Sequence, residues 1–166
     1  MYFSAEITQE SAASLIQKLR EIDDATPRWA RIQNAPIELV INSYGGDAFS
    51  ALGATDMIAS LLSPVRGLVA GAACSSGSLL LMGCTHRLMT ANSFLLIHQL
   101  SGFVYGTHEK FKDEVGMQKK FMQRMIALYA DRSKLTRREV REMLKRETWM
   151  TAEEALKAGL VDAILE

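Results

Sequence analysis

The sequence predicts a single α/β domain in which the strands of a largely parallel sheet alternate with helices. Short apolar segments are followed by segments whose apolar residues recur at helical spacing, and this alternation is typical of such domains. Two of the apolar segments run directly into glycine-containing turns, at 45–46 and at 71–77. With 166 residues, 48% of them hydrophobic, the chain is long enough to bury a core of its own.

The elements follow in order along the chain. Apolar residues at helical spacing predict helices over 9–22, 48–62 and 107–131, and short apolar runs predict strands over 37–41, 65–70, 87–89 and 94–97. The segment 23–36 carries two prolines and is predicted as a surface connection. Capping-box pairs, Thr136 with Glu139 and Thr151 with Glu154, predict the start of two further helices, the second closed by Gly159.

Composition excludes several classes of protein. The 19 Lys and Arg balance 19 Asp and Glu, so no general nucleic-acid partner is expected. No apolar run approaches the roughly 20 residues of a membrane helix, and residues 1–7 do not have the pattern of a signal peptide, so no membrane association is expected. Cys74 and Cys84 form no CxxC, which favours a reduced, cytoplasmic compartment. The three histidines lack metal-ligand spacing, and neither a metal nor another cofactor is expected.

Two strand-to-helix turns could carry chemistry. Gly45-Gly46 would leave backbone N–H groups open to a ligand, although a plain turn has the same pattern. The small-residue run 71–77 contains Ser75 and Ser76 where a helix is expected to begin, and a helix N-terminus can stabilise an oxyanion. The alternative is that one of these serines merely caps the helix.

One histidine stands in a position suited to a base. His98 ends the apolar strand 94–97, a rigid place for a general base, although a histidine there can equally be structural. His86 and His108 compete for the role but lie in polar surroundings that predict exposure to solvent. Cys74 could be the nucleophile instead of a serine, although free cysteines are usually buried small apolar residues.

Four segments together resemble the ClpP serine peptidase family. They are Ile41-Asn42-Ser43-Tyr44-Gly45-Gly46, the run 71–77, Asn92-Ser93-Phe94-Leu95-Leu96-Ile97-His98-Gln99, and Trp149-Met150-Thr151-Ala152-Glu153-Glu154-Ala155 followed by Gly159-Leu160-Val161-Asp162. The likeness covers the whole chain, with an interval from Ser75 to His98 that looks about two residues shorter than usual. The resemblance implies the ClpP/crotonase-like α/β fold, with stacked strands, flanking helices and a handle helix for contact between rings.

The resemblance also assigns roles to residues. It implies Ser75 as nucleophile, His98 as its base, and the N–H groups of Gly46 and Ser76 as the oxyanion hole. Glu147 stands where the family usually has the aspartate of the triad, and a glutamate can also orient an imidazole. The residues expected to bind a substrate peptide along an extended edge are Gly45, Leu100, Ser101, Gly102, Phe103 and Val104.

At the level of the assembly, the resemblance implies a homo-oligomer of two stacked heptameric rings that hydrolyses unfolded proteins or peptides. The head would comprise about 1–98 and 133–166, and the handle about 99–132.

The family's partner is an AAA+ unfoldase such as ClpX or ClpA, but Glu38 and Val40 replace the tyrosines usual in the docking pocket, which argues against docking. The chain starts almost at the first core strand, so the usual pore-lining segment is expected to be missing or trimmed. Glu147 and the run that follows it look closer to phage-type members.

Two other functions stay open at this point. A changed triad acid is compatible with a catalytically silent ring subunit. The crotonase superfamily shares the fold and the oxyanion hole and acts on acyl-CoA thioesters, but it usually relies on carboxylates rather than on a serine and a histidine.

Overall fold

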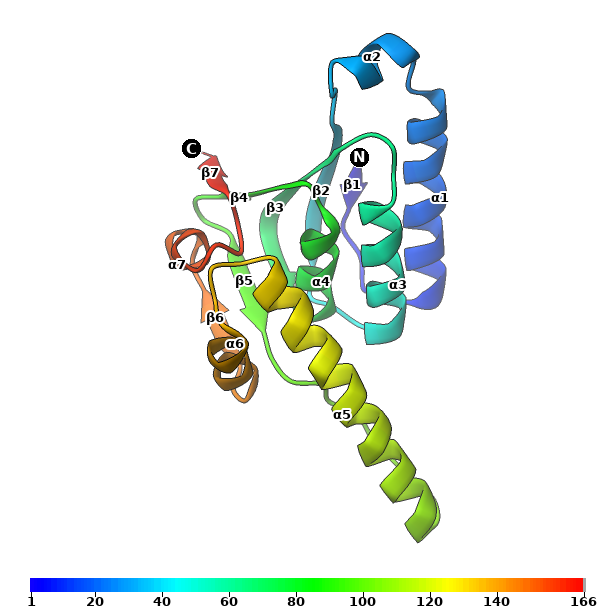
Figure 1. The fold of residues 1–166 in the computed structure, drawn as a ribbon, viewed down its shortest axis with the longest axis vertical. Coiled ribbons are helices and arrows are strands. Elements are labelled where there is room, and N and C mark those ends of the chain that lie inside the picture. The colour runs from blue at the N-terminus through cyan, green and yellow to red at the C-terminus, as the bar shows by residue number, and fades with distance from the viewer. Residues whose placement is uncertain (166) are drawn as a thin grey trace.

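The predicted α/β architecture is present in the computed structural model, which describes residues 1–165. Its seven strands are β1 (Tyr2–Phe3), β2 (Ile37–Ser43), β3 (Val65–Cys74), β4 (His86–Thr90), β5 (Phe94–Ile97), β6 (Thr148–Met150) and β7 (Ala163–Leu165). Its seven helices are α1 (Gln9–Ala25), α2 (Arg28–Ile32), α3 (Ala48–Ala59), α4 (Ser76–Gly83), α5 (His108–Asp131), α6 (Arg137–Leu144) and α7 (Ala152–Ala158). Figure 1 shows α1, α3 and α4 gathered together beside β2 and β3, with α6 and α7 on the opposite flank.

The strands form one sheet in the order β1-β2-β3-β4-β7, with β5 pairing β3 and β6 pairing β5. Every pairing is parallel except that of β5 with β6. Parallel strands need crossover connections, which the helices between them supply.

Strand β3 changes partner half-way along its length. Residues 66–69 pair with β4, whereas 72–74 pair with β5. Between the two lies Gly71, with φ +106°, a conformation that side chains rarely adopt. The Gly71 N–H donates to Ser93 Oγ at 2.9 Å, and the Ala72 N–H donates to Asn42 Oδ1 at 3.2 Å. The bend therefore has its own hydrogen bonds, and it directs the end of β3 toward the site described below.

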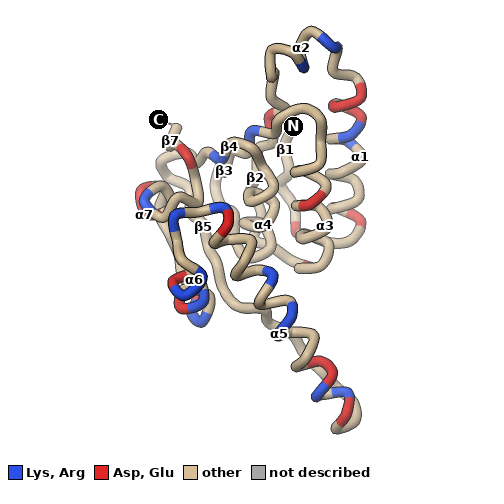
Figure 2. The backbone as a smooth tube through the Cα atoms, viewed as in Figure 1, with Lys and Arg blue, Asp and Glu red and all other residues tan. Residues whose placement is uncertain are grey.

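The core is centred on α4 and β3. All eight residues of α4 are buried, and none carries a charge. In Figure 2 most charged residues lie on the outer helices, a few lie on strands and connections, and α4 and β5 are uncharged. Thr55 in α3 donates to the Leu79 carbonyl at 2.8 Å and so ties α3 to α4. A helix that is apolar on all sides forms because neighbouring elements cover it completely.

Helix α5 has a packed half and a projecting half. Its buried residues are Phe121, Met125, Ile126 and Tyr129, all in the C-terminal half. Figure 1 shows the N-terminal half extending away from the rest of the protein. Thr107 caps that end by accepting from the Lys110 N–H at 3.4 Å.

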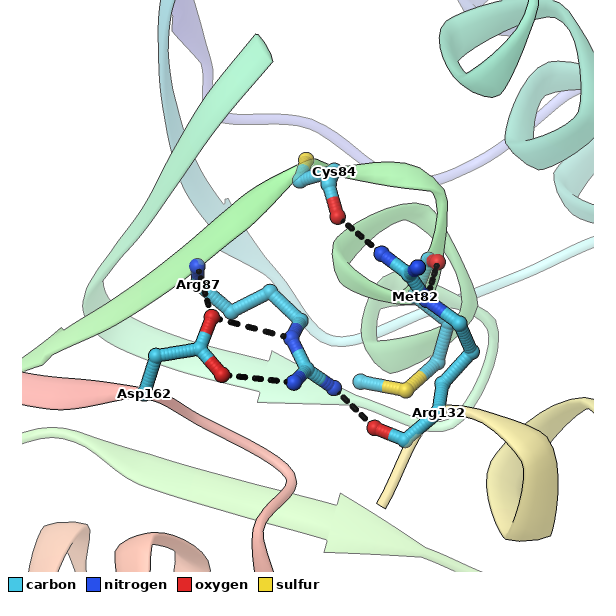
Figure 3. Close-up of polar contacts among 5 residues, drawn as sticks. All are labelled: Met82, Cys84, Arg87, Arg132 and Asp162. Atoms are coloured by element: carbon cyan, nitrogen blue, oxygen red, sulfur yellow. Dashed lines mark hydrogen bonds and ion pairs between the residues drawn. The ribbon is translucent and has the colours of Figure 1, made fainter. Parts of the chain in front are cut away.

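Two arginines anchor the C-terminal end of α5 (Figure 3). Arg132 donates to the carbonyls of Met82, at 3.1 Å, and of Cys84, where α4 ends. Arg87 donates to the Arg132 carbonyl and forms an ion pair with Asp162 at 2.6 Å. Burial alone would raise the pKa of Asp162, but the bonds from Arg87 outweigh it and leave that pKa below its ordinary value.

Most predicted elements agree with the structure, including both capping boxes and the left-handed Gly159 at the end of α7. Apart from shifted element ends, such as α3 ending at Ala59 rather than at 62, and the unpredicted short strands β1, β6 and β7, three details differ. Strand β3 continues to Cys74 rather than ending at 70, because β5 pairs with its last residues. The predicted connection 23–36 contains the short helix α2. Asp23 is not on the surface: it is 4% exposed and accepts from the N–H groups of Leu62 and Ser63, both at 2.9 Å.

Candidate active site

Three strand ends place Ser75, His98 and Glu147 at one edge of the sheet. Ser75 follows the last residue of β3, and His98 follows the last residue of its parallel neighbour β5. Glu147 precedes the first residue of β6, which runs antiparallel to β5 with Ile97 opposite Thr148. Continuing this register by one residue puts Glu147 opposite His98. The sheet therefore brings the predicted nucleophile, base and acid to the same place.

Ser75 has a strained backbone at a sharp strand-to-helix turn. Its φ of 53° and ψ of −124° lie in a region that residues other than glycine avoid. The turn is held by the Ser75 N–H, which donates to the Leu96 carbonyl of β5 at 2.8 Å. The Ser75 hydroxyl makes no hydrogen bond within residues 1–165, and the residue is half-buried. This arrangement, a serine on a strained elbow with a free hydroxyl, is also how α/β-hydrolases present their nucleophile.

The Gly45-Gly46 turn packs directly against this elbow. A Cβ on Gly45 would lie 2.8 Å from both the Cys74 carbonyl oxygen and Ser75 Cβ, so only glycine lets the two turns approach so closely. Ile7 forms a bridge to the turn: its N–H donates to the Gly45 carbonyl at 2.8 Å, and its carbonyl accepts from the Asp47 N–H at 2.7 Å. These bonds leave the Gly46 N–H without an acceptor in the part of the chain that the structure describes.

Ser76 supplies a second unpaired donor. It is the first residue of α4, so its N–H has no partner within the helix. Its side chain donates to the Gly46 carbonyl at 2.9 Å, which joins the two turns. The two expected oxyanion donors, Gly46 and Ser76, are therefore neighbours beside Ser75. A hollow of about 430 Å³, lined by residues 4–6 and 42–46, borders the Gly45 side of the turn.

The base and acid are placed by the sheet but are not bonded to one another. His98 is half-buried and Glu147 is exposed. In the described chain, residues 1–165, neither side chain takes part in a hydrogen bond or an ion pair, with each other or with Ser75. Catalytic hydrogen bonds are often long in unliganded enzymes and shorten when substrate binds. The structure thus brings the three residues to one edge of the sheet, and within residues 1–165 no bond joins their side chains.

The predicted peptide-binding segment lies next to His98. Residues 98–107 contain no strand, and the Leu100 N–H makes a contact of 3.2 Å with the Met122 sulfur of α5. Leu100 and Val104 are half-buried, whereas Ser101, Gly102 and Phe103 are exposed. Apart from the Leu100 N–H, no backbone group of residues 100–104 forms a hydrogen bond within residues 1–165.

The competing residues have surroundings that do not suit catalysis. Cys74 is 1% exposed, and burial raises the pKa of its thiol, which disfavours the reactive thiolate. His86 and His108 are both exposed, and neither adjoins Ser75 in sequence or in the sheet. Among residues 1–165, no three His, Cys, Asp or Glu side chains gather in a way that could hold a metal ion. Nor does that part of the chain include a helix long and apolar enough to cross a lipid bilayer.

Comparison with known proteins identifies the family. The family model described as Clp protease matches residues 1–166. The chain belongs to the Clp protease family. The ATP-dependent Clp protease proteolytic subunit 1 of Chlamydia abortus is 32% identical over 99% of this chain and 85% of its own length. The proteins of the same name from Chlamydia muridarum and Protochlamydia amoebophila are 31% and 32% identical over 99% of this chain, and over 85% and 79% of their own lengths. The α/β fold and the protease class expected from the sequence are those of this Clp family.

Two further polar residues approach the elbow from positions that sequence reasoning did not single out. Ser78 in α4 and Tyr129 in α5 are both 0% exposed, and their hydroxyls are 2.6 Å apart. Because 51 residues separate them, no local sequence pattern could have predicted the pair.

Proposed function

We propose that this protein is a serine endopeptidase in which Ser75 attacks the peptide bond and His98 accepts the serine proton. The observation that carries the proposal is the strained Ser75 elbow packed against the Gly45-Gly46 turn, to which the Ser76 hydroxyl is bonded. Together with the family, this geometry supports acyl-enzyme chemistry rather than a binding role.

The reaction proceeds in two stages. The Ser75 hydroxyl adds to the carbonyl carbon while its proton passes to His98, and the oxygen that becomes negative is bound by the N–H groups of Gly46 and Ser76. The tetrahedral intermediate then expels the amine, which takes the proton from His98, and an acyl-enzyme remains. Water then adds to the acyl group while His98 takes one of its protons. The second tetrahedral intermediate expels the Ser75 oxygen, which recovers that proton from His98, and the carboxylic acid product leaves. Glu147 orients the imidazole and stabilises its positive charge.

Substrate would be held chiefly through its main chain. We infer that an extended peptide pairs with residues 100–104, with Gly45 leaving room for it beside the nucleophile. Main-chain pairing carries no information about side chains, so a broad range of unfolded or short peptides would be accepted.

The assembly proposed is a homo-oligomer of stacked heptameric rings, with 99–132 as the handle and 1–98 and 133–166 as the head. The projecting half of α5 and the connection before it expose large apolar residues: Phe103 at 91%, Tyr105 at 83%, Val115 at 49% and Phe111 at 46%. Such exposed apolar surface on a projecting element is typical of a contact between subunits. Docking to an AAA+ unfoldase is not part of the proposal, because Glu38, which pairs with Arg66 at 2.5 Å, and Val40 stand where the family has tyrosines.

Intact mass after treatment with a fluorophosphonate tests the nucleophile. The wild-type protein should gain one adduct, the Ser75→Ala variant none, and the Cys74→Ala variant one, because the thiol is not the reacting group. An adduct on Ser75→Ala would refute the assignment. Unmodified wild-type protein would instead favour the catalytically silent ring subunit.

Native mass measured by light scattering should give about fourteen subunits, and a monomer would contradict the assembly.

A further inference from the structure

A chain of two hydrogen bonds links the end of α5 to the carbonyl of the nucleophile. Ser78 Oγ donates to the Ser75 carbonyl at 2.6 Å, and the Ser78 N–H donates to the same oxygen at 3.0 Å. The Tyr129 hydroxyl lies 2.6 Å from Ser78 Oγ. Since a carbonyl only accepts, the single Ser78 hydroxyl proton is used on Ser75, and the Tyr129 hydroxyl must donate to Ser78. The chain therefore has one direction, from Tyr129 through Ser78 to Ser75.

The Ser75 carbonyl belongs to the same peptide unit as the Ser76 N–H. A trans peptide is planar, so these two groups point in opposite directions. Holding the carbonyl inward, toward Ser78, consequently directs the N–H outward, to the side where the oxyanion forms. Hydrogen bonds accepted by a carbonyl also polarise its peptide, which strengthens the N–H as a donor. The two buried hydroxyls thus act on an oxyanion donor that neither of them touches.

The surroundings of Tyr129 are suited to such a role. The side chain is fully buried, and burial raises the pKa of its hydroxyl, so it stays a neutral donor. Arg132, one turn further along, is bonded to the carbonyls of Met82 and Cys84 at the other end of α4 (Figure 3). The C-terminal end of α5 is therefore bonded to both ends of α4. Arg132 bonds to the C-terminal end of α4, and Tyr129 bonds to Ser78 near the N-terminal end of α4.

We propose that Ser78 and Tyr129 are positioning residues that fix the Ser75–Ser76 peptide in the orientation needed for transition-state binding. The proposal rests on the assignment of Ser75 as nucleophile. An ordinary alternative is that the pair only satisfies two buried hydroxyls and stabilises the contact between helices. The positioning role and the purely structural role predict different results. Only the positioning role predicts that removing a hydroxyl lowers kcat when the stability of the protein is unchanged.

The test compares Ser78→Ala, Tyr129→Phe and the double variant, with Thr55→Val as a matched control. Thr55 is also a buried hydroxyl that donates to an α4 carbonyl, that of Leu79, but it does not reach Ser75. For each protein kcat and KM are measured with a fluorogenic peptide, together with the fluorophosphonate labelling rate, the affinity for a peptide boronate and the Tm. The boronate forms a tetrahedral adduct on the serine and so reports on the oxyanion donors.

Ser78→Ala should lower kcat by about 10- to 100-fold, which is less than the ~10²–10³-fold expected for loss of an entire donor. KM should change less than threefold, and boronate affinity should fall in parallel with kcat. Tyr129→Phe should have a smaller effect, about three- to tenfold, because Ser78 still bonds Ser75. Thr55→Val should lower Tm without changing kcat.

The double variant separates the two explanations. Ser78→Ala leaves the Tyr129 hydroxyl buried without its partner, so Tm should fall; adding Tyr129→Phe removes that hydroxyl, so Tm should recover while kcat stays low. Recovery of kcat together with Tm, or an equal loss of kcat in Thr55→Val, would overturn the proposal.

If wild type is labelled at Ser75 and Ser78→Ala is labelled at the same rate, this inference alone fails. If wild type is not labelled at all, the proposed function fails and the inference fails with it. Should Ser78→Ala not fold, Tyr129→Phe and the double variant give the same discrimination.

Discussion

The two halves of the candidate site are built in different ways. The half that contains Ser75, Gly46 and Ser76 is fixed by backbone conformation and by short hydrogen bonds to Ile7, Leu96 and Ser78. The half that contains His98 and Glu147 is positioned by sheet register, and its side chains form no hydrogen bond within residues 1–165. Backbone geometry can thus fix the proposed nucleophile and the proposed oxyanion donors in a single chain, whereas the proposed base and acid also depend on side-chain torsions.

The largest effect is expected from a substitution in the rigid half. In Gly46→Ala the new Cβ would lie 2.1 Å from the Ile7 carbonyl oxygen, at a φ of +142°, so the bridge to Ile7 must break. Peptidase activity should fall below detection, and the Tm should drop. The control is Gly53→Ala in α3, where a Cβ meets nothing within 4 Å and the helix should gain about 0.5–1 kcal/mol. An active Gly46→Ala protein would show that the turn is not fixed as described.

The next effect concerns the base in the other half. His98→Gln should lower kcat by about 10²–10⁴-fold, the usual contribution of general base catalysis, without changing the Tm. His86→Gln, at an exposed histidine, is the control and should retain full activity. A His98→Gln protein with the kcat of the wild type would contradict His98 as the base.

A smaller effect is expected at the acid. Because Glu147 is exposed and unbonded in this structure, Glu147→Gln should reduce kcat by about tenfold, well below the roughly 10⁴-fold seen when a buried triad aspartate is changed. Glu147→Asp, which restores the acid usual in the family, should retain activity within about threefold. The control Glu142→Gln changes a nearby exposed carboxylate that forms an ion pair with Lys145 at 2.7 Å. Full activity in Glu147→Gln would remove Glu147 from the site.

The smallest effect on catalysis is expected at Asp23, which belongs to the scaffold. Burial alone would raise the pKa of Asp23, but the hydrogen bonds from Ser63 and Leu62 outweigh it and lower the pKa below its ordinary value. A lowered pKa means that the carboxylate stabilises the fold above its unfolded-state pKa and that this stability is lost as the pH falls through the folded value. Asp23→Asn should cost about 1–3 kcal/mol at pH 7, by urea unfolding, with unchanged kcat. The difference from wild type should shrink in acid, and a constant difference would refute the assignment.

The parts of the molecule that sequence could predict are those set by local pattern. Strand 94–97 was predicted with its observed bounds, and the caps at Thr136 and Thr151 follow from residues three apart. Ser75, His98 and Glu147 came from a family resemblance, and the structure brings them to one sheet edge. The continuation of β3 to Cys74 and the Ser78–Tyr129 pair depend on contacts between distant segments, which no local periodicity encodes.

The position of β5 between β3 and β6 has a consequence for how this site tolerates change over evolution. One strand sets the register of both neighbours, so Ser75 and Glu147, the proposed nucleophile and acid, are aligned to His98 by pairing and not by the length of the chain between them. A deletion in the connections before β5 leaves that alignment intact. A single residue inserted within Phe94–Ile97 would instead shift His98 relative to both partners and reverse the faces of the strand. Length variation in lineages that keep the activity should therefore be confined to those connections and absent from the four residues of β5.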